Sequence, residues 1–117
     1  MSKVLEELMH EIIRFRDERD WKQFHKPKDL ALSLSIEAAE LLECFQWKND
    51  EDIEKMLQNE DKIKIEEEVA DIAAYLILLC DSMDIDLLAA IKDKIEKNRN
   101  KYPVEKCKGK ADKYTEL

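Results

Sequence analysis

The backbone of this chain is almost free of residues that interrupt a helix. Among 117 residues there is one glycine, Gly109, and there are two prolines, Pro27 and Pro103, while leucine, alanine, glutamate and lysine are abundant. Glycine and proline are the most costly residues inside a helix, and the abundant four are among the least costly. The sequence therefore predicts an all-α protein, and its length fits a single domain spanning residues 1–117.

Apolar residues recur at helical spacing in four long segments. These segments cover about residues 3–19, 30–47 and 61–81, and a fourth that runs from residue 87 toward Pro103. Residues that commonly cap helices precede them: Asp29, then Asn49 or Asp50 before a short polar helix, then Asp84 or Asp86. Four helices with short connections predict an antiparallel four-helix bundle. The tail from residue 103 to 117 has no sustained period, and we expect it to be irregular.

Charge and cysteine content exclude several functional classes. A net charge of −8 disfavours binding to a nucleic acid polymer. Cys44, Cys80 and Cys107 are odd in number and have no CxxC spacing, so they predict neither a disulfide framework nor a zinc site. The chain lacks both a leader pattern at its start and the ~18–20 apolar residues that a membrane span requires. We expect a cytoplasmic protein without membrane contact.

Two pairs of acidic residues are the most informative local pattern. Glu37 and Glu40 are three residues apart, and so are Glu68 and Asp71. On a helix this spacing places both carboxylates on one face, one turn apart. The segment 30–45 that carries the first pair is apolar around most of its circumference, which predicts burial in a core and against a second subunit.

Buried carboxylates without neighbouring cations indicate a metal site. Neither pair has an arginine or lysine inside its motif, and oxygen ligands favour Mg²⁺. A di-iron bundle would need two Glu-x-x-His elements, whereas the chain has one, from Glu7 to His10, which we interpret as surface residues. The alternative is that the acidic pairs lie on solvated helix faces, as in a nonenzymatic helical module that binds a partner protein.

Aromatic side chains flank the acidic pairs along the sequence. Trp21 and Trp47 lie before and after the apolar segment, and Tyr75 follows Asp71 by one helical turn. These three residues could fill the ends of the core or stack on a nucleobase, and both interpretations stay open. His25 could contact a base or a phosphate, or could serve as a capping or surface residue.

The last long helix ends in basic residues. Lys94, Asn98 and Arg99 are spaced to reach a common ligand, and they could bind phosphate oxygens. Alternatively, their positive charges could simply interact favourably with the carboxyl end of the helix.

Several motifs together carry a resemblance to a known family. The acidic pairs followed by a KxxxNRxxYP element resemble the MazG-like superfamily of all-α nucleoside triphosphate pyrophosphohydrolases. Further segments are similar to the dCTP pyrophosphatase branch: residues 18–30 (ERDWKQFHKPKDL), residues 45–47 (FQW) and residues 113–117 (KYTEL). Ile12 and Phe15 depart from the pattern, because some relatives have a polar base contact there, so the base preference stays open.

The resemblance implies a Mg²⁺-dependent enzyme of nucleotide-pool housecleaning. Its substrate would be a dNTP, dCTP or a modified dCTP, cleaved to the monophosphate and pyrophosphate. The implied metal ligands are Glu37, Glu40, Glu68 and Asp71, and either of the first two would orient the attacking water. The implied base contacts are Trp21, Trp47 and Tyr75, and the implied phosphate contacts are Lys94, Asn98 and Arg99. His25 is kept beside them as a further candidate for substrate binding. Members are homo-oligomers, commonly tetramers built as a dimer of dimers.

Overall fold

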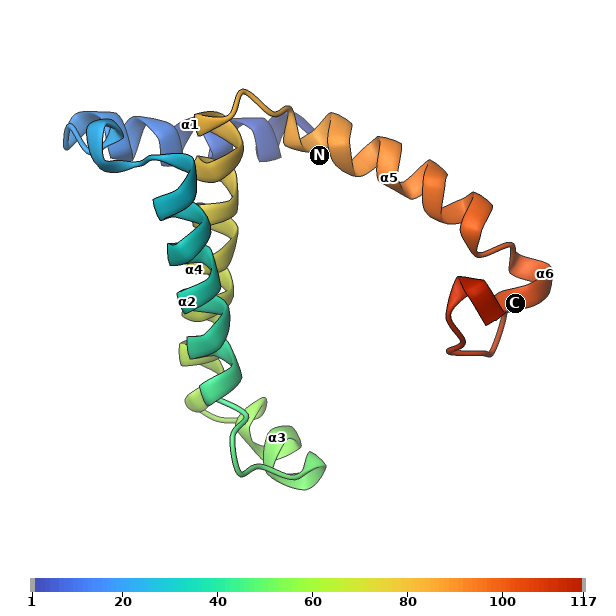
Figure 1. Ribbon diagram of the computed structural model, residues 1–117. Coiled ribbons are helices and arrows are strands. Elements are labelled where there is room, and N and C mark those ends of the chain that lie inside the picture. Colours follow the sequence, from blue (N-terminus) through green and yellow to red (C-terminus); the bar gives the residue numbers. More distant parts are fainter. Residues whose placement is uncertain (1, 117) are drawn as a thin grey trace. The chain divides into compact units, whose positions relative to one another are not determined.

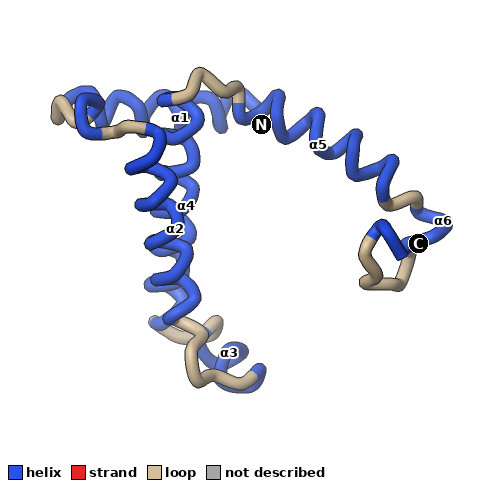
Figure 2. The backbone as a smooth tube through the Cα atoms, viewed as in Figure 1, coloured by secondary structure: helices blue, strands red, loops and turns tan. Residues whose placement is uncertain are grey.

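A computed structural model of the chain describes residues 2–116 (Figure 1). Within these residues all regular structure is helical, as the tube view makes plain (Figure 2), so the predicted all-α class is confirmed. The elements are α1 (Ser2–Glu18), the 3₁₀ helix η1 (Lys22–Phe24), α2 (Pro27–Glu43), α3 (Asp50–Met56), α4 (Asp61–Ser82), α5 (Leu87–Lys101), α6 (Val104–Cys107) and the 3₁₀ helix η2 (Tyr114–Glu116).

The chain divides into two compact units. The first contains residues 1–84 and carries α1 to α4, and the second contains residues 85–117 with α5, α6 and η2. The tail after Pro103, expected to be irregular, holds α6 and η2. No helix within residues 2–116 is both long enough and apolar enough to cross a membrane.

The first unit is built on the pair of α2 and α4, which lie side by side and run in opposite directions (Figure 1). The buried apolar residues of these two helices are Leu30 of α2, which is 2% exposed, and Ile65, Ile77, Leu78 and Cys80 of α4. Helix α1 packs against α4 as well. Because α2 and α4 are antiparallel, side chains near the middle of each face one another.

Local sequence explains where the helices begin. Asn49 caps α3 through a reciprocal pair of hydrogen bonds, in which the backbone N–H of Asp52 donates to Asn49 Oδ1 over 2.9 Å. Asp86 caps α5. Of the alternatives predicted from the sequence, the cap is thus Asn49 and not Asp50 for α3, and Asp86 and not Asp84 for α5. The predicted cap at Asp29 is wrong, because α2 already begins at Pro27. Proline suits the first helical position, where its missing N–H costs nothing and its fixed φ is already helical.

Helix α2 ends at Glu43, and residues 44–47 form a turn. Several of its apolar side chains are more than half exposed on the single chain: Leu32, Ile36 and Leu42. The first unit therefore exposes apolar side chains of α2 that no other part of the unit covers.

Candidate functional site

Three of the four predicted metal ligands come together at the middle of the α2–α4 pair. Glu37 and Glu40 project from successive turns of α2, and Glu68 projects from α4. One carboxylate oxygen of each lies within 4.8 Å of the others. The antiparallel packing of α2 and α4 creates this arrangement, since it brings residues thirty positions apart in sequence face to face. We call these three residues the acidic cluster.

The acidic cluster lies partly inside the protein. Glu37 and Glu68 are half-buried, and the Oε2 atom of each is inaccessible and has no hydrogen-bond partner. None of the ion pairs formed within the described residues involves a member of the cluster. Burying a polar atom without a partner is costly, so these oxygens form a natural position for a ligand.

Electrostatics at the cluster are dominated by like charges. The pKa of Glu37 is raised from 4.5 to about 7, first by burial, then by the neighbouring carboxyls of Glu40 and Glu68 and by the charge of Asp71. Asp71, the fourth predicted ligand, therefore lies close enough to act on Glu37 although it is outside the cluster. Carboxylates that repel one another in this way attract a cation.

A cavity of about 620 Å³ adjoins this region between α1, the segment after α1 and α4. Its volume suits a small organic ligand. Three of the predicted base contacts line it together, namely Trp21, His25 and Tyr75, and so does Asp71. The cavity wall is otherwise mostly apolar and includes Ile12 and Phe15 of α1.

Trp21 lines this cavity beside two other aromatic rings. Its ring packs edge-on to Phe15 at 5.8 Å between centroids, and lies 6.4 Å from the ring of His25. Trp21 is still 41% exposed, so part of its ring is free to meet a ligand. His25 is half-buried, and its pKa is lowered by burial and by the positive charge of Arg16, which favours the neutral imidazole.

Trp47 lies elsewhere. It follows the carboxyl end of α2 in a turn with φ of 65° and is 92% exposed. Trp21 precedes the amino end of the same helix, whose 17 residues extend for about 25 Å. The structure therefore does not bring the two tryptophans together within one chain.

The predicted phosphate contacts lie on α5, in the second unit. Lys94, Asn98 and Arg99 are all exposed on its last turns. Arg99 pairs with Glu96, one turn earlier on the same helix. Within that unit Lys101 and Tyr102 meet the tail through the ring of Tyr114, whose centroid lies 4.9 Å from the Lys101 ammonium.

One buried residue beside the cavity was missed from the sequence. Arg16 is 3% exposed, lines the cavity, and forms ion pairs with Asp17 and Asp81. A signal was present, because Arg16 follows Ile12 by four residues and so continues the apolar face of α1. A buried arginine at such a position needs an acidic partner within reach.

Comparison with known proteins gives a consistent result. The model of the MazG-like family matches residues 32–117. A dCTP pyrophosphatase 1 from Rattus norvegicus is 40% identical over 115 residues, covering 97% of this chain and 68% of the relative. The human protein of that name is 38% identical over the same shares. A crystal structure of a pyrophosphatase from Archaeoglobus fulgidus superposes with a TM-score of 0.77 and 47% identity, covering 85% of this chain and 92% of the other.

Proposed function

This chain belongs to the MazG-like family, and we propose that it hydrolyses a deoxynucleoside triphosphate to the monophosphate and pyrophosphate with the help of Mg²⁺. That it is a nucleoside triphosphate pyrophosphohydrolase follows from its relatives. The acidic cluster is the observation that supports the proposed metal dependence. The adjoining cavity supports the proposed binding of a nucleotide. Our proposed substrate is dCTP or a modified dCTP, and the names of the relatives specify dCTP for those proteins.

The residues of the cluster fit a hard divalent cation. Every donor in it is a carboxylate oxygen, and two of these oxygens are buried without partners. Oxygen-only donor sets select Mg²⁺ over softer metals. Glu37, Glu40 and Glu68 would hold the ion, with Asp71 as the fourth predicted ligand. When bound, Mg²⁺ neutralises the negative charge that develops on the phosphates during phosphoryl transfer.

The carboxylates also have a role toward water. Glu37 or Glu40 would orient a water molecule for in-line attack on the α-phosphorus and accept its proton. A new bond forms between the water oxygen and the α-phosphorus as the bond to the bridging oxygen breaks. That oxygen leaves with pyrophosphate. Both residues are suited to this, because they project from adjacent turns of a rigid helix.

The base would occupy the cavity beside Asp71. Trp21 offers a partly exposed ring for stacking, and a neutral His25 can accept or donate one hydrogen bond. Tyr75 lines the same cavity. Trp47 is proposed as a further base contact. Lys94, Asn98 and Arg99 are proposed as phosphate contacts.

We propose further that the chain assembles with copies of itself. The exposed apolar side chains of α2 would be covered in a homo-oligomer, which we expect to be a tetramer formed as a dimer of dimers. The antiparallel four-helix bundle predicted from the sequence belongs to this proposal as well.

The rival function, a nonenzymatic module that binds a partner through its acidic surface, requires the paired acids to be solvated. One residue of each pair, Glu37 and Glu68, is half-buried and opposes it, while Glu40 and Asp71 are exposed. The discriminating assay measures pyrophosphate release from the four dNTPs, modified dCTPs and NTPs, with and without Mg²⁺. Glu40→Gln should abolish Mg²⁺-dependent release while leaving the helical circular dichroism unchanged. Turnover near the wild-type rate in this variant would exclude Glu40 from the site.

A further inference from the structure

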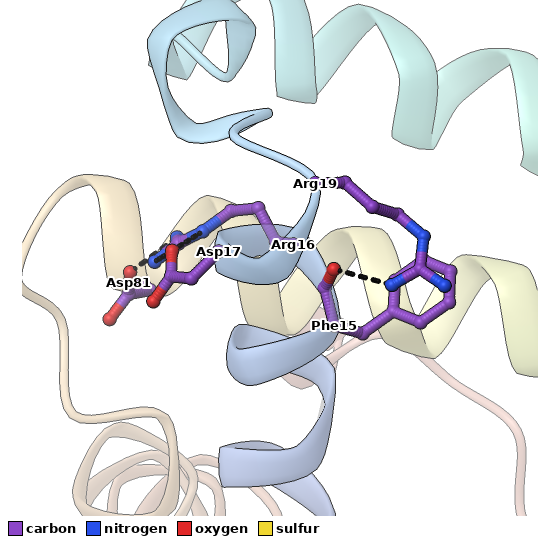
Figure 3. Close-up of polar contacts among 5 residues, drawn as sticks. All are labelled: Phe15, Arg16, Asp17, Arg19 and Asp81. Carbon is purple, nitrogen blue, oxygen red and sulfur yellow. Dashed lines mark hydrogen bonds and ion pairs between the residues drawn. The ribbon is translucent and has the colours of Figure 1, made fainter.

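Arg16 has the most unusual environment of any charged side chain that the structure describes. It is the one buried charged residue among them. Its Nε atom donates to Asp17 Oδ1 over 2.9 Å, and its Nη1 atom donates to Asp81 Oδ2 over 2.7 Å (Figure 3). Its Nη2 atom lies 2.8 Å from the same Asp17 oxygen as part of the ion pair. Asp17 is its neighbour on α1, whereas Asp81 belongs to the last turn of α4. The guanidinium thus ties the end of α1 to the end of α4.

The backbone of the same residue holds the segment that carries Trp21. The carbonyl oxygen of Arg16 accepts hydrogen bonds from the N–H groups of Arg19 and Trp21, each over 3.2 Å. Between them the chain turns through Asp20, whose φ of 54° lies in the left-handed region. Trp21 is therefore one hydrogen bond away from a residue whose side chain is anchored on α4.

The aromatic rings around Trp21 depend on this turn. Arg19 lies over the ring of Phe15 at 3.6 Å and near that of Trp21 at 5.9 Å, and its Nη1 atom donates to the Phe15 carbonyl (Figure 3). Arg16 and His25 line the main cavity and also a second one of about 470 Å³.

Burying the Arg16 guanidinium is a poor way to gain stability, because the cost of its desolvation offsets its attraction to two partly exposed aspartates. The ion pairs also have a geometric effect, since contacts with carboxylates on two helices fix the direction of the guanidinium. The residue fixed in this way is Arg16, which lines the cavity proposed for the base. Its partner Asp81 lies in the last turn of α4, well beyond Glu68 of the acidic cluster.

We propose that the Arg16–Asp81 ion pair is a positioning clamp, which fixes Trp21 and His25 at the cavity and thereby sets affinity and discrimination among nucleobases. This inference rests on the proposed function, since it requires the cavity to be the base site. Arg16 acts through Trp21 and His25 and is a positioning residue.

Steady-state kinetics of Arg16→Met and Asp81→Asn test the clamp. Both variants should raise KM for the preferred nucleotide by about tenfold, a loss of about 1.4 kcal/mol of binding. They should change kcat by less than about threefold and reduce the preference for that base over the other dNTPs. The KM and base preference of Arg16→Lys should fall between those of these variants and those of the wild type. Lysine keeps the positive charge but lacks the planar guanidinium that can contact two carboxylates.

Arg14→Met is the matched control. Arg14 is an exposed arginine on the same helix, and its replacement should leave KM and base preference as in the wild type. A merely structural ion pair would lower the melting temperature of Arg16→Met and Asp81→Asn with unchanged KM and unchanged base preference, and that result would overturn the inference. Asp81→Asn carries the test if Arg16→Met does not fold, since Asp81 is only partly buried.

Tryptophan fluorescence gives a readout that does not depend on turnover. In a Trp47→Phe background Trp21 is the remaining tryptophan of the two in the chain. Adding Arg16→Met should increase quenching of its emission by acrylamide, because the ring loses its anchor. Unchanged quenching would refute the clamp. Absence of pyrophosphate release by the wild type from every nucleotide would instead refute the proposed function, and the two failures are therefore distinguishable.

Discussion

Replacing Glu37 by glutamine is expected to stabilise the metal-free protein at alkaline pH while removing its response to Mg²⁺. In the folded chain the pKa of Glu37 rises from 4.5 to about 7, through burial and through the carboxyls of Glu40, Glu68 and Asp71. A carboxyl with a raised pKa in the folded state stabilises the protein most below its unfolded pKa. That contribution is lost as the pH rises through the folded pKa.

The size of the effect follows from the two pKa values. The interval from about pH 5.5 to the folded pKa of about 7 is roughly 1.5 pH units. Each unit corresponds to about 1.4 kcal/mol in the free energy of unfolding. The wild-type protein would thus lose at most about 2 kcal/mol between about pH 5.5 and about pH 8. Water screens a half-buried carboxyl, so we expect a measured loss of about 1 kcal/mol.

Urea unfolding at these two pH values, at one protein concentration, measures this loss. Glu37→Gln should remove most of it, because glutamine stays neutral throughout. Millimolar Mg²⁺ should stabilise the wild type at the higher pH and leave Glu37→Gln unaffected, since a ligand of the folded state raises its stability. Glu67→Gln, which removes an exposed charge of α4 next to the cluster, is the control and should behave as the wild type. Equal pH dependence in Glu37→Gln and Glu67→Gln would refute the electrostatic reasoning.

Two further substitutions test the core and the outlying tryptophan. Leu30→Ala should lower the free energy of unfolding in urea by about 2–5 kcal/mol, because this leucine of α2 is only 2% exposed. A loss below about 1 kcal/mol would contradict this and show that the neighbours close around the smaller side chain. Trp47→Ala should raise KM for nucleotides while changing stability by less than about 0.5 kcal/mol, as its ring is 92% exposed; lower stability at unchanged KM would show that Trp47 belongs to a packed core.

The helices were predictable because their signals are local. Apolar periodicity locates the four long helices, and the capping residues Asn49 and Asp86 mark where α3 and α5 begin. The error at Asp29 arose where two start signals compete, and Pro27 prevailed because its backbone is already helical. The meeting of Glu37 with Glu68 was also foreseeable, because the spacing of the acids and the antiparallel order of their helices determine it.

The cavity beside the acidic cluster was harder to predict from the sequence. Trp21, His25 and Tyr75 could be named as candidates, but that they share a cavity depends on how α1 crosses α4. Arg16 was missed because an arginine in a charged segment is normally solvated, and only its contact with Asp81, 65 residues away, accounts for its burial. Long-range pairs of this kind leave little trace in a single sequence.

Hydrolysis in water labelled with heavy oxygen is the most direct test of the central claim. Purified wild-type protein with Mg²⁺ and dCTP should release dCMP and pyrophosphate in equal amounts, with the label in dCMP, because the attack falls on the α-phosphorus. Glu40→Gln should yield neither product. Release of orthophosphate, or label found in pyrophosphate, would contradict the account, and so would undiminished release after removal of all divalent metal.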